Sequence, residues 1–91
     1  MGAGLTKSQV ANAYRRVDRY ILKELKDFPL VKSAPHYWKV KDFPIFIQVR
    51  KIVASNAETC FLVCINGEHS WGSLAIRLQQ SIVKYGKVGV L

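Results

Sequence analysis

The chain has 91 residues, 49% of them hydrophobic and 22% charged, and 14 Lys and Arg oppose 6 Asp and Glu to give a formal net charge of +8. This length suits one small domain, and the composition excludes a disordered chain and a multidomain enzyme. No apolar run approaches the roughly 20 residues that span a bilayer, and the first twenty residues lack the apolar segment of a signal peptide. We therefore expect a single domain over residues 1–91, cytoplasmic and in a reducing compartment.

After a short flexible start at residues 1–6, residues 7–28 carry the pattern of a long amphipathic helix. Thr6 and Gln9 have the spacing of a capping box, which marks a helix N-terminus. Pro29 ends the pattern. The apolar residues recur every three or four positions, which places them on one face of the helix: Val10, Tyr14, Val17, Ile21, Leu25 and Phe28.

Residues 37–65 predict an antiparallel meander of three strands, at 37–43, 45–53 and 59–65, preceded by a connector at residues 29–35. Alternation in the first strand places Trp38 and Val40 on the face toward the helices. The dipeptide Asn66-Gly67 is a tight-turn signal and could open a short fourth strand at residues 68–71. Short connections between the strands favour antiparallel pairing of neighbours.

A second helix is predicted over residues 74–85, with Ser73 as its cap and Gly86 as its C-terminal stop before a tail at residues 86–91. The fold expected from these elements is α+β, with both helices on one face of the sheet. The order helix, three strands, helix is similar to that of double-stranded-RNA-binding domains. The similarity concerns topology alone, because the second helix begins Ser73-Leu74-Ala75-Ile76-Arg77 and lacks the lysine-rich run that holds phosphates in those domains.

The most informative feature for function is a set of cations on the first predicted helix, which we call the basic ridge. At 100° per residue these cations fall within a sector of about 100°, nearly opposite the apolar stripe. The acidic residues of the helix lie outside that sector, whereas a merely solvated face usually mixes the two signs. The ridge therefore favours contact with successive phosphates of a nucleic acid, a solvated basic face without a partner being the alternative. Its members are Arg15, Arg16, Arg19, Lys23 and Lys26.

The sheet face that points away from Trp38 offers a second candidate surface. Aromatic rings alternate there with cations, a combination that suits stacked bases and their phosphates and favours RNA over duplex DNA. The alternative is that these rings cover the sheet or contact a partner subunit. The residues concerned are Tyr37, Lys39, Lys41, Phe46, Gln48 and Arg50.

The third predicted strand, residues 59–65, is apolar on both faces, so we expect it to need cover on both sides. A homodimer would supply that cover. The same features also fit a rival hypothesis, a protein-binding module such as a viral or phage-encoded inhibitor or a subunit of a larger assembly, in which the ridge meets an acidic protein surface.

Motifs for catalysis and metal binding are weak. His36 and His69 could each act as a general base, but neither lies in an acid–base or nucleophile motif, so the chain is predicted to be non-catalytic and without a cofactor, a small ribonuclease being the alternative. Cys60 and Cys64 lie about 13 Å apart along one strand face, too far for a disulfide, and are expected to be buried free thiols. With the two histidines they have no recognised zinc-ligand spacing.

Residues 1–6 also match the short pattern for N-myristoylation, with Gly2 as the acceptor. One acyl chain binds membranes only marginally, and the basic ridge could supply a second signal. A lipid-anchored peripheral protein is therefore a third hypothesis.

Overall fold

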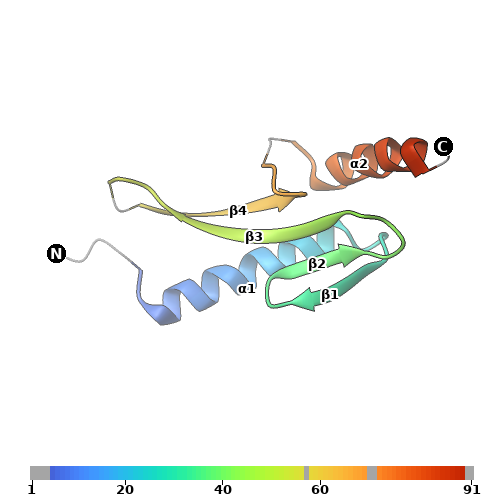
Figure 1. Cartoon of the computed structure of the whole chain (residues 1–91). Helices are drawn as coiled ribbons and strands as arrows, with labels where there is room; N and C mark the ends of the chain where they lie inside the picture. The colour runs from blue at the N-terminus through green and yellow to red at the C-terminus, as the bar shows by residue number, and fades with distance from the viewer. Residues whose placement is uncertain (1–4, 57, 70–71, 90–91) are drawn as a thin grey trace.

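The computed structural model describes residues 5–56, 58–69 and 72–89, and of residues 86–89 the backbone alone. Its four strands form one antiparallel sheet in the order β1-β2-β3-β4, so the predicted α+β class is confirmed. The elements are α1 (Lys7–Glu24), β1 (Leu30–Ala34), β2 (Tyr37–Val40), β3 (Phe46–Val53), β4 (Thr59–Ile65) and α2 (Leu74–Gly89) (Figure 1).

The start of α1 is as predicted, but its end comes earlier. The Thr6 side chain accepts a hydrogen bond from the Gln9 backbone, and the Gln9 side chain accepts one from the Thr6 backbone, which completes the capping box. The helix ends at Glu24, with Leu25 as its C-cap, and not at residue 28. Pro29 has no N–H to donate to the Leu25 carbonyl, as a continued helix would require. That carbonyl instead accepts a hydrogen bond from the Phe28 N–H at 3.0 Å, in a turn that follows the helix.

The segment expected to be a connector forms β1, which pairs with β2 through Leu30 opposite Val40 and Lys32 opposite Trp38. The turn between the two strands contains His36 at a φ of +60°. This left-handed conformation is usually supplied by Gly, Asn or Asp, so the sequence lacks the common hairpin signal at this position. The sheet's fourth strand is therefore β1 and not residues 68–71.

The Asn66-Gly67 turn forms as predicted, with φ values of +52° and +80°. Beyond it, Glu68 makes an isolated antiparallel bridge to Ile65, while residues 70 and 71 of the expected strand lie outside the described residues. The Asn66 side chain links three elements, because it accepts a hydrogen bond from the Phe46 backbone at 2.9 Å and donates one to the Tyr85 hydroxyl at 3.1 Å. The turn thus fixes α2 against the end of the sheet.

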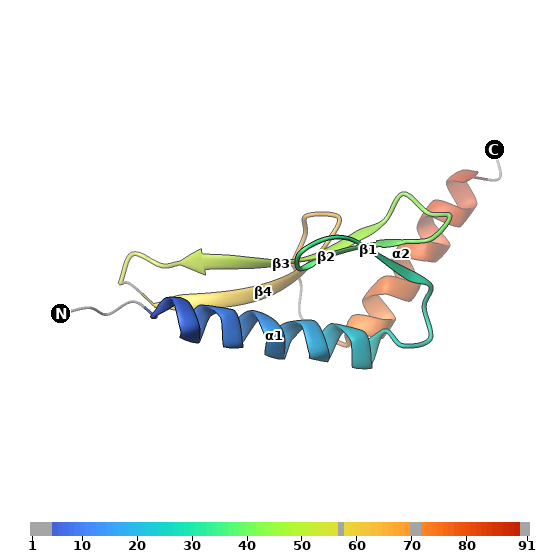
Figure 2. The ribbon, with the colours of Figure 1, turned by 90° about the horizontal axis from the view of Figure 1, so that it is seen from below.

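One core lies between the sheet and the helices. Ile21 of α1, Val40 and Ile47 of the sheet and Leu78 of α2 are fully buried in it. Figure 2 shows α1 lying along one face of the sheet, while α2 starts near the end of α1 and runs past the end of β4. In the described part of the chain no helix lies over most of the sheet face opposite α1, although Cys64 on that face is buried near the end of β4.

The helix α2 is longer than expected. Ser73 caps it through a bond from the Ile76 backbone at 3.4 Å, as predicted. The predicted stop at Gly86 is wrong, because the helix continues to Gly89. A glycine inside a helix costs only about 1 kcal/mol relative to alanine, so it lowers helix stability without ending the helix.

Trp38 faces the core as the alternation predicted, with 3% of its surface exposed. We expect Trp38→Ala to lower the free energy of unfolding by about 3–5 kcal/mol, because the core loses both transfer energy and packing. Urea denaturation measures the change. Tyr37→Ala is the control, since Tyr37 is only half-buried on the other face, and an equal loss in both variants would contradict the assignment of the faces.

Candidate nucleic-acid interface

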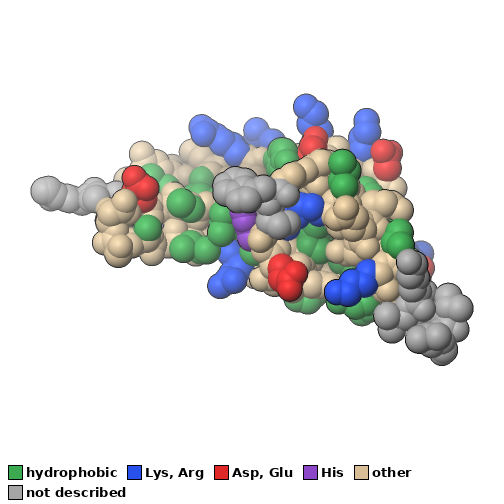
Figure 3. Space-filling model, turned by 90° about the horizontal axis from the view of Figure 1, so that it is seen from above, with side chains coloured by type: hydrophobic (Ala, Val, Ile, Leu, Met, Phe, Trp, Pro, Cys, Tyr) green, Lys and Arg blue, Asp and Glu red, His purple; other side chains and the backbone are tan. Residues whose placement is uncertain are grey.

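All five cations of the basic ridge are exposed. Arg15, Arg16, Arg19 and Lys23 lie on α1, whereas Lys26 follows the shortened helix in the turn after it. Since Ile21 is fully buried against the sheet, α1 is held in the rotation that directs the ridge away from the core. Figure 3 shows Lys and Arg side chains along the margin of the molecule where α1 lies, with a few Asp and Glu side chains among them.

Few acidic groups compensate these charges. In the described part of the chain no cation of the ridge forms an ion pair, and Asp18 of the same helix contacts His36 instead. Arg15 donates a hydrogen bond to the Asn12 side chain at 3.2 Å, a neutral partner that leaves its charge uncompensated. The ridge is therefore a predominantly positive surface whose cations have no ion-pair partners among the described residues, and such a surface attracts a polyanion.

The second candidate surface lies on the opposite face of the sheet. Tyr37 and Phe46 stack there with ring centroids 5.4 Å apart and an interplanar angle of 19°. Lys39 and Arg50 share this face and are exposed, and Gln48 is half-buried on it. A shallow hollow of about 330 Å³ lies beside the aromatic pair.

The fold does not bring the two predicted surfaces together. The basic ridge points away from α1's contact with the sheet, and the aromatic surface is on the far side of that sheet (Figure 2). Lys41 lies outside both surfaces, because it follows the end of β2. Its backbone N–H donates a hydrogen bond to the Pro29 carbonyl oxygen at 2.8 Å. A rigid ligand that lies on one surface cannot contact the other.

His36 has a partner that the sequence did not reveal. Its Nδ1 lies 2.8 Å from Oδ2 of Asp18, and its ring stacks on Tyr14 with centroids 4.1 Å apart. This contact gives one oxygen of the Asp18 carboxylate a partner, whereas the other oxygen, Oδ1, is buried without a hydrogen-bond partner. The pair holds the β1–β2 turn against α1, and a carboxylate bonded to Nδ1 is also the arrangement that orients an imidazole for proton transfer.

A hollow of about 400 Å³ opens beside His36, with Lys7 and Lys51 in its lining. His69, the other candidate base, is exposed and lies beyond the Asn66-Gly67 turn, in the lining of a different hollow. The two histidines therefore do not form one site. No sequence motif signals the pairing of Asp18 with His36, since they belong to different elements.

The cysteines are both free, and only Cys64 is buried, so the expected burial of Cys60 is wrong. Cys60 belongs to the uncovered face near the far end of β4, where nothing among the described residues packs over it. Within residues 5–56, 58–69 and 72–89 no group of three His, Cys, Asp or Glu could hold a metal ion.

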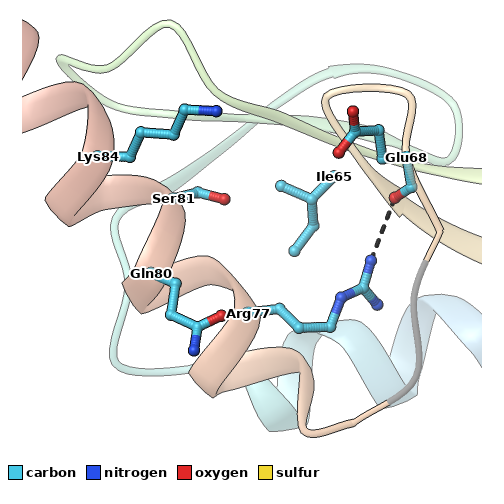
Figure 4. Close-up of a pocket in the computed structure, with 6 residues that line it drawn as sticks. All are labelled: Ile65, Glu68, Arg77, Gln80, Ser81 and Lys84. Carbon is cyan, nitrogen blue, oxygen red and sulfur yellow. Dashed lines mark hydrogen bonds between the residues drawn. The ribbon is translucent and has the colours of Figure 1, made fainter.

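A further polar hollow of about 220 Å³ lies between α2 and the turn after β4 (Figure 4). Arg77 donates from Nη2 to the Glu68 carbonyl oxygen at 3.2 Å across it. Lys84 and Glu68 also line it, so this hollow carries both signs of charge. Arg77 therefore binds the backbone of the loop after β4, whereas the cations of the ridge are directed to solvent.

Gly2, the candidate lipidation site, lies outside the described residues. Among the helices in the described part of the chain, none combines the length and apolar character needed to cross a bilayer.

Comparison of the chain with protein-family models, with curated proteins and with solved structures gave no match.

The contact with Asp18 predicts which nitrogen of the neutral His36 ring carries the proton. A carboxylate can only accept, so Nδ1 should be protonated and Nε2 free. Long-range ¹H–¹⁵N NMR spectra of the imidazole, recorded well above neutral pH, distinguish the two tautomers. Asp18→Asn is the matched control and should relax the preference, whereas a dominant Nε2–H form in the wild type would contradict the observed contact.

Proposed function

We propose that this chain is a small, non-catalytic, intracellular nucleic-acid-binding protein that holds phosphates along the basic ridge. The main support for the proposal is that none of the five exposed cations forms an ion pair in the described part of the chain. Desolvating such a surface against protein carboxylates would require a specific partner, whereas every nucleic acid presents a regular row of phosphates.

The length of the ridge supports several phosphate contacts. At 1.5 Å per residue, about 12 Å of helix axis separates Arg15 from Lys23. Each strand of a duplex carries one phosphate for about every 3.4 Å of the duplex axis, so the ridge is long enough to face three or more phosphates when α1 runs along that axis. Arginine contributes directed pairs of hydrogen bonds to phosphate as well as charge, and three of the five cations are arginines.

Single-stranded RNA is the nucleic acid that the two surfaces favour. A duplex is stiff over about 150 base pairs, so it can lie against the ridge or against the sheet but not against both. A single strand can bend around the molecule and reach the Tyr37–Phe46 pair with its bases while its phosphates contact α1. Lys39 and Arg50 would hold phosphates next to the stacked bases.

Binding to a single-stranded RNA should weaken steeply with salt, because each phosphate contact releases condensed counterions. With three to five contacts we expect a log–log slope of about −2 to −3.5. Replacing Arg16, Arg19 and Lys23 together with Gln should flatten the slope by about two units. It should leave stability almost unchanged, because all three side chains are exposed on a helix that tolerates Gln. Fluorescence anisotropy over a salt series gives the slope.

The control is the replacement of Arg77 and Lys84 on α2 with Gln, which removes cations that belong to neither proposed surface. This control variant should lose less affinity for RNA than the α1 variant, and its salt slope should stay closer to that of the wild type. An unaltered slope in the α1 variant would contradict the assignment of the site. If the wild type binds no nucleic acid at low salt, the ridge belongs instead to an acidic protein or an anionic membrane.

A further inference from the structure

The outer edge of β4 carries backbone groups without partners in the sheet. The Asn66 backbone N–H donates to Phe46 of β3, and the Ala54 N–H donates to Glu58, so even-numbered residues of this segment direct their backbone polar groups toward β3. In an antiparallel ladder this direction alternates residue by residue. The odd-numbered residues of β4 therefore direct their N–H and C=O groups away from the sheet.

The length of this open edge is defined at both ends. Ile65 already exchanges two hydrogen bonds with Glu68, at 3.0 and 3.1 Å, which closes the edge at the end of β4. At the other end the strand begins at Thr59, just after the β3–β4 turn. The open edge thus consists of Thr59, Phe61 and Val63, evenly spaced about Phe61.

The two edges of the sheet differ in how they are protected. The β1 edge lies between two prolines, contains Lys32, and has a register irregularity between Lys32 and Ala34, all of which discourage pairing with another strand. The seven residues of β4 include no charge, no proline and no glycine. An apolar and unprotected edge of this kind is a site for strand addition.

We propose that a second copy of this chain pairs with β4 along this edge, antiparallel and about a two-fold axis at Phe61. Thr59 then faces Val63 of the partner subunit, and Phe61 faces Phe61 of the partner subunit. This register is self-complementary, because every open N–H and C=O of the three residues gains a partner in both copies. It gives the predicted homodimer a definite interface, and it does not depend on nucleic-acid binding.

The side chains next to the edge also fit a second copy. Tyr20 of α1, 47% exposed, lines a hollow of about 210 Å³ together with Phe61 and Val63, and the partner's apolar strand would cover it. Figure 3 looks onto this side of the molecule and shows hydrophobic side chains between cations at its margins. The two-fold axis is perpendicular to the sheet, so both α1 helices lie on one face and both basic ridges point the same way.

Two copies of net charge +8 repel each other, and salt screens that repulsion. We therefore expect sedimentation velocity without nucleic acid to show a monomer–dimer equilibrium that shifts toward the dimer as salt rises. This direction is opposite to that of RNA binding, so RNA-bridged association would be recognised by its loss in salt. A chain that stays monomeric at high micromolar concentration in high salt would overturn the proposal.

A cross-link tests the register. In the proposed pairing Leu62 faces Cys60 of the partner subunit across a non-hydrogen-bonded pair, where Cα atoms lie about 4.5 Å apart, within the range of a disulfide. Mild oxidation of the Leu62→Cys variant should therefore give a covalent dimer, and mass spectrometry should find the introduced thiol bonded to Cys60. Lys39→Cys, an exposed position two strands from the edge, is the control.

The wild type and the control variant should remain largely without cross-links, because Cys60 faces Leu62 of the partner subunit and not another thiol. Equal cross-linking in both variants, or a bond that joins Cys60 to Cys60, would overturn the register. Val63→Pro gives an independent measurement: it removes an edge N–H that has no partner within the sheet, so it should reduce dimerisation while circular dichroism shows the fold intact.

Discussion

The burial of the apolar stripe of α1 against the sheet is the interaction on which the other features depend. Ile21 and Leu25 are buried with Trp38, Val40 and Ile47 of the sheet, which fixes the rotation of the helix about its axis. Once that rotation is fixed, the cations that share the opposite sector must face solvent. In the described part of the chain most of the sheet surface behind the core has no helix over it, because α2 runs past the end of β4 (Figure 1).

This arrangement separates the chain into surfaces of different chemistry. The ridge on α1 carries charge of one sign, the far face of the sheet carries aromatic rings with cations, and the β4 edge is neutral. The proposed dimer would use the neutral edge alone, leaving both charged surfaces free in each copy. It would also place two ridges on one face, which would lengthen the surface offered to a single RNA strand.

The sequence predicts those elements whose signals are local. The 3.6-residue period of α1, its capping box, the Asn-Gly turn and the bounds of β4 all follow from neighbouring residues. The strand β1 is not predictable in this way, because its hairpin turn relies on His36 in a left-handed conformation that glycine or asparagine usually adopts. The end of α2 is likewise missed, since a glycine weakens a helix without obliging it to stop.

The same difference between local and tertiary signals decides which parts of the candidate site are predictable from the sequence. Helical spacing is enough to place Arg15 and Lys23 on one exposed face, so the ridge is predictable from the sequence. The relation between the ridge and the sheet surface is not, because it depends on which face α1 covers. The contact between Asp18 and His36 also escapes prediction, since tertiary packing of the β1–β2 turn on α1 creates it.

Phosphate binding by the ridge on α1 can be followed residue by residue in NMR spectra of the isotope-labelled chain during titration with a short single-stranded RNA. The arginine side-chain Nε–Hε signals report each guanidinium separately. We expect those of Arg15, Arg16 and Arg19 to shift early and saturate together, ahead of the signal of Arg50 on the opposite face. Shifts that begin at Arg50 and the Tyr37–Phe46 pair, with the α1 arginines unchanged, would contradict phosphate binding by the ridge.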